Sequence, residues 1–287
     1  MTVTDRLTQK TNDGEHYRVN ICRRDLIIWA TVIIFSNHLF FIITGTKSAS
    51  LSQIVLDLSA VGIFQYMAWY VIFYLLSSSD TTRAPRWRDF LVIVPLCLLV
   101  LLPTSRMIWV AAAGISIYLL LPDSDDPKLR AAGAVLAALA VQQFWGHVLF
   151  NLVAFPLLRA ETAVVGTILE SIRPGTVWQD NIITGPSGFG IVVHTACSSY
   201  HNLSLAMLCW ITISKLRDQN WRSRDLMIGS VVAGTMIFLN LVRLSLMACG
   251  LDLFHYWHEG AGADIFAIGA SFAILLISLY GSRRRGG

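Results

Sequence analysis

Long apolar runs separated by short polar segments are the feature that most constrains how this chain can fold. The runs occupy residues 26–44, 54–76, 90–102, 108–121, 131–158, 198–214, 226–248 and 265–280. About 18 or more apolar residues suffice for a membrane-crossing helix. Only 14% of the 287 residues are charged, against about a quarter in soluble domains. The pattern predicts an all-α integral membrane protein, a polytopic helical bundle of about eight transmembrane helices.

Two parts of this pattern leave the helical structure open. The runs 90–102 and 108–121 are short, and Pro103 lies between them. They fit either a tight helical hairpin that extends into its flanks or a re-entrant pair. Residues 159–196 are rich in Gly, Pro and Thr, which favour turns and loops, so we expect a non-helical stretch there.

The distribution of basic residues predicts the orientation. Most of the 22 lysines and arginines lie in alternate polar segments, which the positive-inside rule assigns to the cytoplasm. Both termini are then cytoplasmic, with residues 1–25 as an N-terminal tail and 26–287 as one multi-spanning domain. The loops 159–197 and 250–264 are extracytoplasmic. Because this topology also explains the net charge of +4, we predict no nucleic-acid partner.

Cys197 lies where a polar segment, Thr195-Ala196-Cys197-Ser198-Ser199, becomes an apolar run. Unpaired N–H groups and the positive end of the helix dipole favour a thiolate at such a position. The residue is therefore a candidate nucleophile, although a buried structural thiol is the alternative. The five cysteines form no CxxC pair, so neither a zinc site nor a disulfide framework is indicated.

Two further reactive residue types are predicted on the same outer face. Arg243 lies near the outer end of the run 226–248 and could stabilise a thiolate or an oxyanion, or extend to the interface as an ordinary snorkelling arginine. Asn240, at i−3, could hold the guanidinium. His258 is a candidate acid or base, with His255 and His201 as competing candidates. An interfacial aromatic belt with incidental histidines is the alternative.

Two other functions compete with a cysteine enzyme. Gly185-Pro186-Ser187-Gly188 matches the GxSG pattern of rhomboid serine proteases, but ten residues of expected loop follow it, whereas that serine should begin a membrane helix. A transporter or membrane scaffold is also consistent with the membrane content. The polar residues of the run 131–158 could then line a path: Gln142, Gln143, His147 and Asn151.

Three ordered motifs resemble those of the exosortase/archaeosortase family. They are Cys197-Ser198-Ser199, the Asn-x-x-Arg motif from Asn240 to Arg243, and the His-x-x-x-Gly motif from His258 to Gly262. One departure from the family pattern is Ser199, which replaces the usual glycine after Cys-Ser. No family motif is found in the N-terminal half.

The resemblance implies a cysteine protease and transpeptidase of the bacterial inner membrane. Such an enzyme cleaves the C-terminal sorting signal of an exported protein, made of a short motif such as Pro-Glu-Pro, a membrane helix and a basic tail. The new carboxyl end then passes to an acceptor, a lipid or a glycan. Cys197 is the implied nucleophile, Arg243 the charge stabiliser and His258 the acid/base, with Asn240, Ser198 and His201 in support. No metal or cofactor is implied.

Overall fold

The computed structural model describes residues 21–45, 62–121 and 126–282. Its N-terminal helices are α1 (Arg23–Gly45), α3 (Ile63–Ser77), α4 (Trp87–Val100), α5 (Ser105–Leu120) and α6 (Pro127–Ala140). A π-helical turn η2 (Val141–Trp145) and α7 (Gly146–Ile172) follow. The last elements are a 3₁₀ turn η3 (Thr195–Cys197), α8 (Ser199–Arg217), α9 (Ser223–Ala248), α10 (Leu251–His258) and α11 (Ala261–Gly281). The predicted all-α architecture therefore describes the bulk of the chain.

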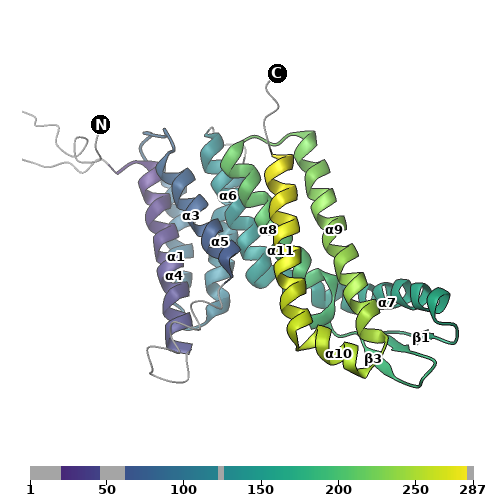
Figure 1. Cartoon of the computed structure of the whole chain (residues 1–287). Coiled ribbons are helices and arrows are strands. Elements are labelled where there is room, and N and C mark those ends of the chain that lie inside the picture. Colours follow the sequence, from purple (N-terminus) through teal and green to yellow (C-terminus); the bar gives the residue numbers. More distant parts are fainter. Residues whose placement is uncertain (1–20, 46–61, 122–125, 283–287) are drawn as a thin grey trace, which may run out of the picture.

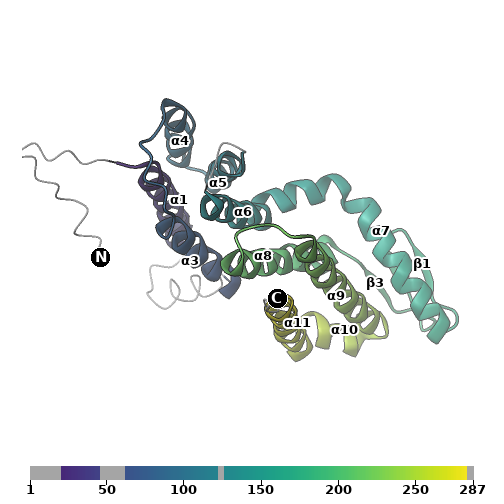
Figure 2. The same ribbon diagram turned by 90° about the horizontal axis from the view of Figure 1, so that it is seen from above.

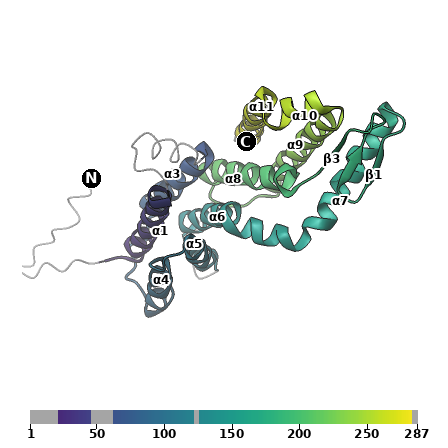
Figure 3. The same ribbon diagram turned by 90° about the horizontal axis from the view of Figure 1, so that it is seen from below.

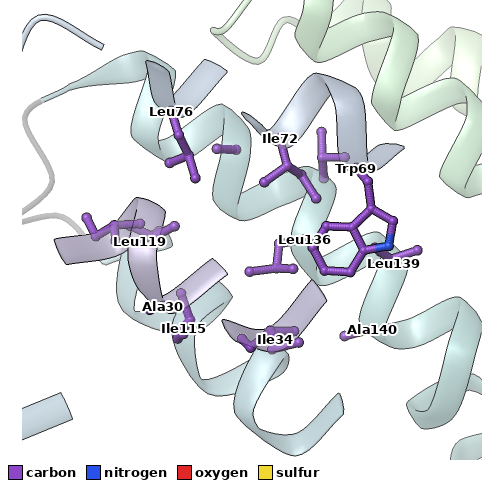
Figure 4. Packing of buried hydrophobic residues seen from close by; sticks show 14 of the residues in the cluster. Ala30, Ile34, Trp69, Ile72, Leu76, Ile115, Leu119, Leu136, Leu139 and Ala140 are labelled. Carbon is purple, nitrogen blue, oxygen red and sulfur yellow. The ribbon is translucent and has the colours of Figure 1, made fainter. Parts of the chain in front are cut away.

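Most helices stand upright in a bundle (Figure 1), and two apolar cores hold these upright helices together. The first core joins α1, α3, α4, α5 and α6, and Figure 4 shows its packing, with Ile34, Trp69 and Leu136 among the buried side chains. The second core joins α8, α9 and α11. Many large apolar side chains point outward; Trp29 and Ile268, for example, are 65% and 71% exposed. Such a surface suits lipid rather than water.

Within the described ranges, four helical segments are long and apolar enough to cross a membrane. They are Arg23–Thr44, Pro127–Ile172, Ser223–Ala248 and Ala261–Gly281, and Ile63–Ser77 and Ser105–Leu120 are shorter apolar helices. The two short runs at 90–121 form the helices α4 and α5, and the choice between a spanning hairpin and a re-entrant pair remains a prediction. Residues 54–61 of the second predicted run lie outside the described residues. A count of eight spans remains a prediction.

Two hydrogen bonds made by arginines connect chain segments at one end of the bundle. The N–H of Arg23 donates to Arg83 O at 2.8 Å, so the start of α1 meets the segment before α4. The Arg217 guanidinium donates to Leu279 O at 2.7 Å and joins the last turns of α8 and α11. The described chain thus begins and ends at the same end of the bundle, and α10 and the strands lie at the opposite end (Figure 1). The side of the membrane that each end faces remains a prediction.

The prediction of a non-helical stretch at residues 159–196 was partly wrong. Helical structure continues through residue 159 to Ile172, and α10 occupies most of the predicted loop at 250–264. After η2 the chain changes direction, and α7 runs outward from the bundle (Figures 2 and 3). A π-helical turn re-aims a helix in this way. The buried positions Leu158, Glu161, Thr162, Val165 and Leu169 follow helical spacing, which the mixed hydropathy of the segment concealed.

A three-stranded antiparallel sheet follows α7. Its strands are β1 (Val177–Gln179), β2 (Ile182–Thr184) and β3 (Gly190–Val192), in the order β1-β2-β3. The sheet packs on α7 through Trp178, whose ring would be 2.4 Å from a Cβ at Gly166. Only glycine at this position admits the ring. Figures 2 and 3 place β3 between α7 and α9, so the sheet delivers the chain to the start of α8.

Candidate active site

Cys197 ends the 3₁₀ turn η3, directly between β3 and α8. Its N–H donates to His194 O at 2.9 Å, and its side chain is buried, with 8% of the residue exposed. Ser198 is the N-cap of α8, since its hydroxyl accepts from the N–H of Tyr200 at 3.2 Å. The predicted location at a helix entrance is therefore confirmed, and the thiol is less accessible than its polar neighbours suggest.

Electrostatics at the thiol differ from the sequence-based expectation. Burial raises the pKa of the Cys197 thiol, while the charge of Arg243 and a hydrogen bond from the His194 backbone lower it, and the net shift is upward. The first N–H groups of α8 are not available to a thiolate, because Ser199 N donates to Glu161 Oε1 at 3.0 Å and Tyr200 N donates to Ser198. The favourable charge at the sulfur comes from Arg243.

Asn240 connects α9 to η3 (Thr195–Cys197), the cysteine turn. It is fully buried, and its Nδ2 donates to Cys197 O at 3.0 Å and to Ser199 Oγ at 3.2 Å. Its Oδ1 accepts from Asn202 Nδ2 at 3.4 Å. The sequence suggested that this amide holds Arg243; it holds the backbone of the cysteine turn instead. The hydroxyl of Ser199, where the family pattern has glycine, adds an acceptor for the same amide.

Glu161 of α7 is a site residue that the sequence reasoning missed. Its Oε1 accepts from the Ser198 hydroxyl at 3.2 Å and from Ser199 N at 3.0 Å. Its other oxygen, Oε2, is buried without a hydrogen-bond partner among the described residues. Burying a carboxylate is costly unless it is hydrogen-bonded. The hydrogen bonds to Ser198 and Ser199 therefore give the buried Glu161 a specific role at the start of α8. The helical spacing of residues 158–169 is the signal that could have found it.

Arg243 lies in the next to last turn of α9 and connects it to α10. Its Nε donates to the backbone oxygen of Trp257 at 3.0 Å. The guanidinium carbon lies 5.0 Å from the ring centroid of Phe266, within the range of a cation–π contact. Two elements therefore hold the guanidinium close enough for its charge to act on the Cys197 thiol.

The predicted histidine lies beside this network. His258 follows Trp257 at the end of α10, stacks on Phe254 at 4.8 Å between ring centroids, and places Nδ1 3.3 Å from Glu259 Oε1. Among the described contacts the imidazole does not hydrogen-bond the thiol. His255 packs edge-on to the same Phe254 ring at 5.7 Å, and the side chain of His201 lies outside the described part of the structure. The choice of acid/base remains a prediction.

A cavity of about 360 Å³ lies beside the cysteine turn. Thr195 and Tyr200 from the turn and α8 form one wall, and α7 contributes His147 and Asn151. Gln142, which accepts from Gln65 Nε2 at 3.0 Å, also lines it. Three of the four residues considered for a transport path thus line a cavity that Thr195 of the same 3₁₀ turn also lines.

The alternative nucleophile Ser187 lies in a different setting. It is exposed in the turn between β2 and β3, and the strand β3 follows it. The helix that a rhomboid serine should begin is therefore replaced by a strand. The described geometry does not support the serine-protease interpretation.

The family model of transmembrane exosortases matches residues 30–276. The match includes every described helix from most of α1 to most of α11, and all three motifs. No curated protein and no solved structure matches the chain.

Proposed function

The chain belongs to the transmembrane exosortase family, and on this premise we propose that it is a cysteine-dependent transpeptidase of C-terminal sorting signals. The observation that carries the proposal is the setting of Cys197. The thiol lies under the charge of Arg243, and its backbone is held by Asn240 from α9. A buried structural cysteine needs neither interaction. The substrate is an exported protein whose tail comprises a short motif, a membrane helix and a basic end.

The proposed chemistry is covalent acyl transfer. The Cys197 thiolate attacks the scissile carbonyl carbon, and a C–S bond forms as the carbonyl oxygen becomes an oxyanion. Arg243, which stays protonated, stabilises this negative charge. When the C–N bond breaks, His258 gives a proton to the leaving amine, and a thioester remains. A nucleophile of the acceptor, a lipid or a glycan, then attacks the thioester and releases the thiol.

The raised pKa of Cys197 has a consequence for this sequence of steps. Because the thiol is mostly protonated at neutral pH, a base must remove its proton when the substrate binds. His258 is the proposed base, and it then carries the proton that the leaving amine receives. Closure of α10 over the bound tail would bring the imidazole to the sulfur. The hydrogen bond from Arg243 to Trp257 O, one residue before His258, ties the end of α10 to the guanidinium that acts on the thiol.

The location follows from the predicted topology. A sorting tail with a basic cytoplasmic end presents its motif at the outer face of the membrane. We place Cys197 on that face of a bacterial inner membrane, with both termini in the cytoplasm. A cavity lined by Thr195, two residues before the cysteine, lies on the same part of the structure.

Processing of a co-expressed reporter tests the proposal. The reporter is an exported protein fused to a sorting tail that is encoded in the host genome. Cys197→Ala should abolish cleavage and any covalent intermediate, whereas Cys209→Ala, at a buried cysteine of the second core, should leave cleavage unchanged. Full processing by Cys197→Ala would refute the proposal. A transporter would tolerate this change and respond to substitutions at Gln142, His147 and Asn151.

A further inference from the structure

The outer edge of β3 carries backbone groups that point away from the sheet. The hydrogen bonds from Val193 N to Asn181 O and from Gly185 N to Phe189 O, both 2.8 Å, flank the β2–β3 ladder and fix which of its positions are hydrogen-bonded. In an antiparallel ladder, bonded and non-bonded positions alternate. With Val192 paired to Ile182 and Gly190 to Thr184, the N–H and C=O groups of Gly190 and Val192 face outward. Among the described residues these groups have no other hydrogen bond.

The same edge leads to the thiol. His194 continues the alternation, so its N–H points to the same side as the outward groups of Gly190 and Val192. The carbonyl of the same residue accepts from the Cys197 N–H at 2.9 Å. A row of backbone groups on one side of a single segment therefore ends at the nucleophile.

The outer edge of β3 is accessible because the sheet contacts the bundle with one of its faces and not with this edge. The side chains of Ile191 and Val193 are buried against α9 residues such as Leu244, whereas Gly190, Val192 and His194 are exposed. Val192 is 44% exposed. A free edge strand is a template on which an extended peptide can pair, and many peptide-binding domains use this mode.

We propose that the outer edge of β3, through the backbone groups of Gly190 and Val192, binds the sorting tail as an added β-strand and guides its scissile bond to Cys197. This inference rests on the proposed function, because it names how the substrate of that site is held. Backbone pairing accepts varied side chains and requires an extended segment with free N–H groups at alternate positions. The site would thus select an extended conformation rather than particular side chains.

A pair of variants isolates the outward N–H of Val192. Val192→Pro removes this N–H but leaves the ladder bonds of Ile191 and Val193, and Val192→Ala changes the side chain while the N–H remains. Processing of the tailed reporter should be slower in Val192→Pro than in Val192→Ala by roughly two- to tenfold, the effect of one lost hydrogen bond. Alkylation of Cys197 by iodoacetamide, which needs no peptide, should be equal in both. Equal processing would overturn the proposal.

A substrate-side measurement covers the case in which Val192→Pro disturbs the turn. Synthetic peptides that span the motif, each with one N-methylated backbone amide, compete with the reporter for the full-length wild-type protein. Inhibition constants should rise roughly two- to tenfold at every second position, and a profile without alternation would overturn the inference. If processing requires Cys197 but shows neither the slowing in Val192→Pro nor the alternating N-methylation profile, the proposed function stands and only the strand-addition inference fails. If processing does not need Cys197, the proposed function itself fails and the inference fails with it.

Discussion

The side-chain amide of Asn240 donates to the backbone carbonyl of Cys197 at 3.0 Å, across 43 residues of sequence. This bond makes α9 a support for the 3₁₀ turn that presents the thiol. From the other side, Glu161 of α7 bonds the Ser199 N–H. The cysteine turn is therefore fixed between two buried polar side chains, each from a different helix.

Asn240→Ala should weaken this support. The buried carbonyl of Cys197 loses its partner, which costs about 1–3 kcal/mol. We expect a lower melting temperature in detergent and slower reporter processing. Ser199→Gly, which removes only the hydroxyl that accepts at 3.2 Å, is the control and should process within a few-fold of wild type. Equal effects of the two changes would show that the amide is unimportant to the turn.

Glu161→Ala should loosen the start of α8. It leaves the buried N–H of Ser199 without an acceptor, at a cost of about 1–3 kcal/mol, and Glu161→Gln should recover part of this loss through its amide oxygen. The rate of Cys197 alkylation and the melting temperature check the order wild type, Gln, Ala. Glu170→Ala, at an exposed position of the same helix, is the matched control. A Glu161→Ala protein with wild-type values would contradict the assignment.

Arg243→Gln should move the pH dependence of Cys197 alkylation upward. Only the thiolate reacts, and the charge of Arg243 lowers the pKa of a thiol whose pKa burial raises. Removing the charge raises the pKa further, so the midpoint shifts to higher pH. Arg243→Lys keeps the charge and should shift less. Reporter processing by Arg243→Gln should fall about 100-fold if the guanidinium stabilises the oxyanion. An unchanged midpoint would contradict the electrostatic role.

His258→Ala should slow processing by about 10²–10⁴, the usual contribution of a general acid or base. His255→Ala is the control, because His255 contacts the same Phe254 ring but is not assigned the proton transfer. Single-turnover cleavage of the reporter, followed over pH 5–9, measures both. A large loss in His255→Ala with a mild one in His258→Ala would transfer the role to His255.

Asp89→Ala should destabilise the opposite end of the bundle. Asp89 is fully buried and bonds Arg23 Nε at 2.8 Å and the Tyr118 hydroxyl. Removing one partner of a buried ion pair costs about 3–5 kcal/mol. Asp80→Ala breaks an ion pair whose carboxylate is 94% exposed and should cost about 1 kcal/mol or less. Thermal unfolding in detergent compares them, and similar losses would show that burial is not decisive.

Local sequence pattern was sufficient where one apolar run forms one helix. The runs at 198–214, 226–248 and 265–280 correspond to α8, α9 and α11 with ends within a few residues. It failed at residues 159–172, because a helix that carries a buried carboxylate and small residues has no apolar run. It also failed at 177–192, since three-residue strands carry too little periodicity to be recognised.

By itself the sequence determined that this chain is a membrane protein of the exosortase family, because hydropathy and ordered motifs are properties of the linear chain. It also marked Cys197 and Arg243, since a cysteine at a helix entrance and an arginine in an apolar run are locally unusual. Only the tertiary structure decided that Asn240 supports the cysteine turn, that Glu161 occupies the start of α8, and that an open strand edge leads to the thiol. These relationships depend on the bend after η2 and on the packing of α7, α9 and the sheet, and no local pattern encodes distances between segments so far apart.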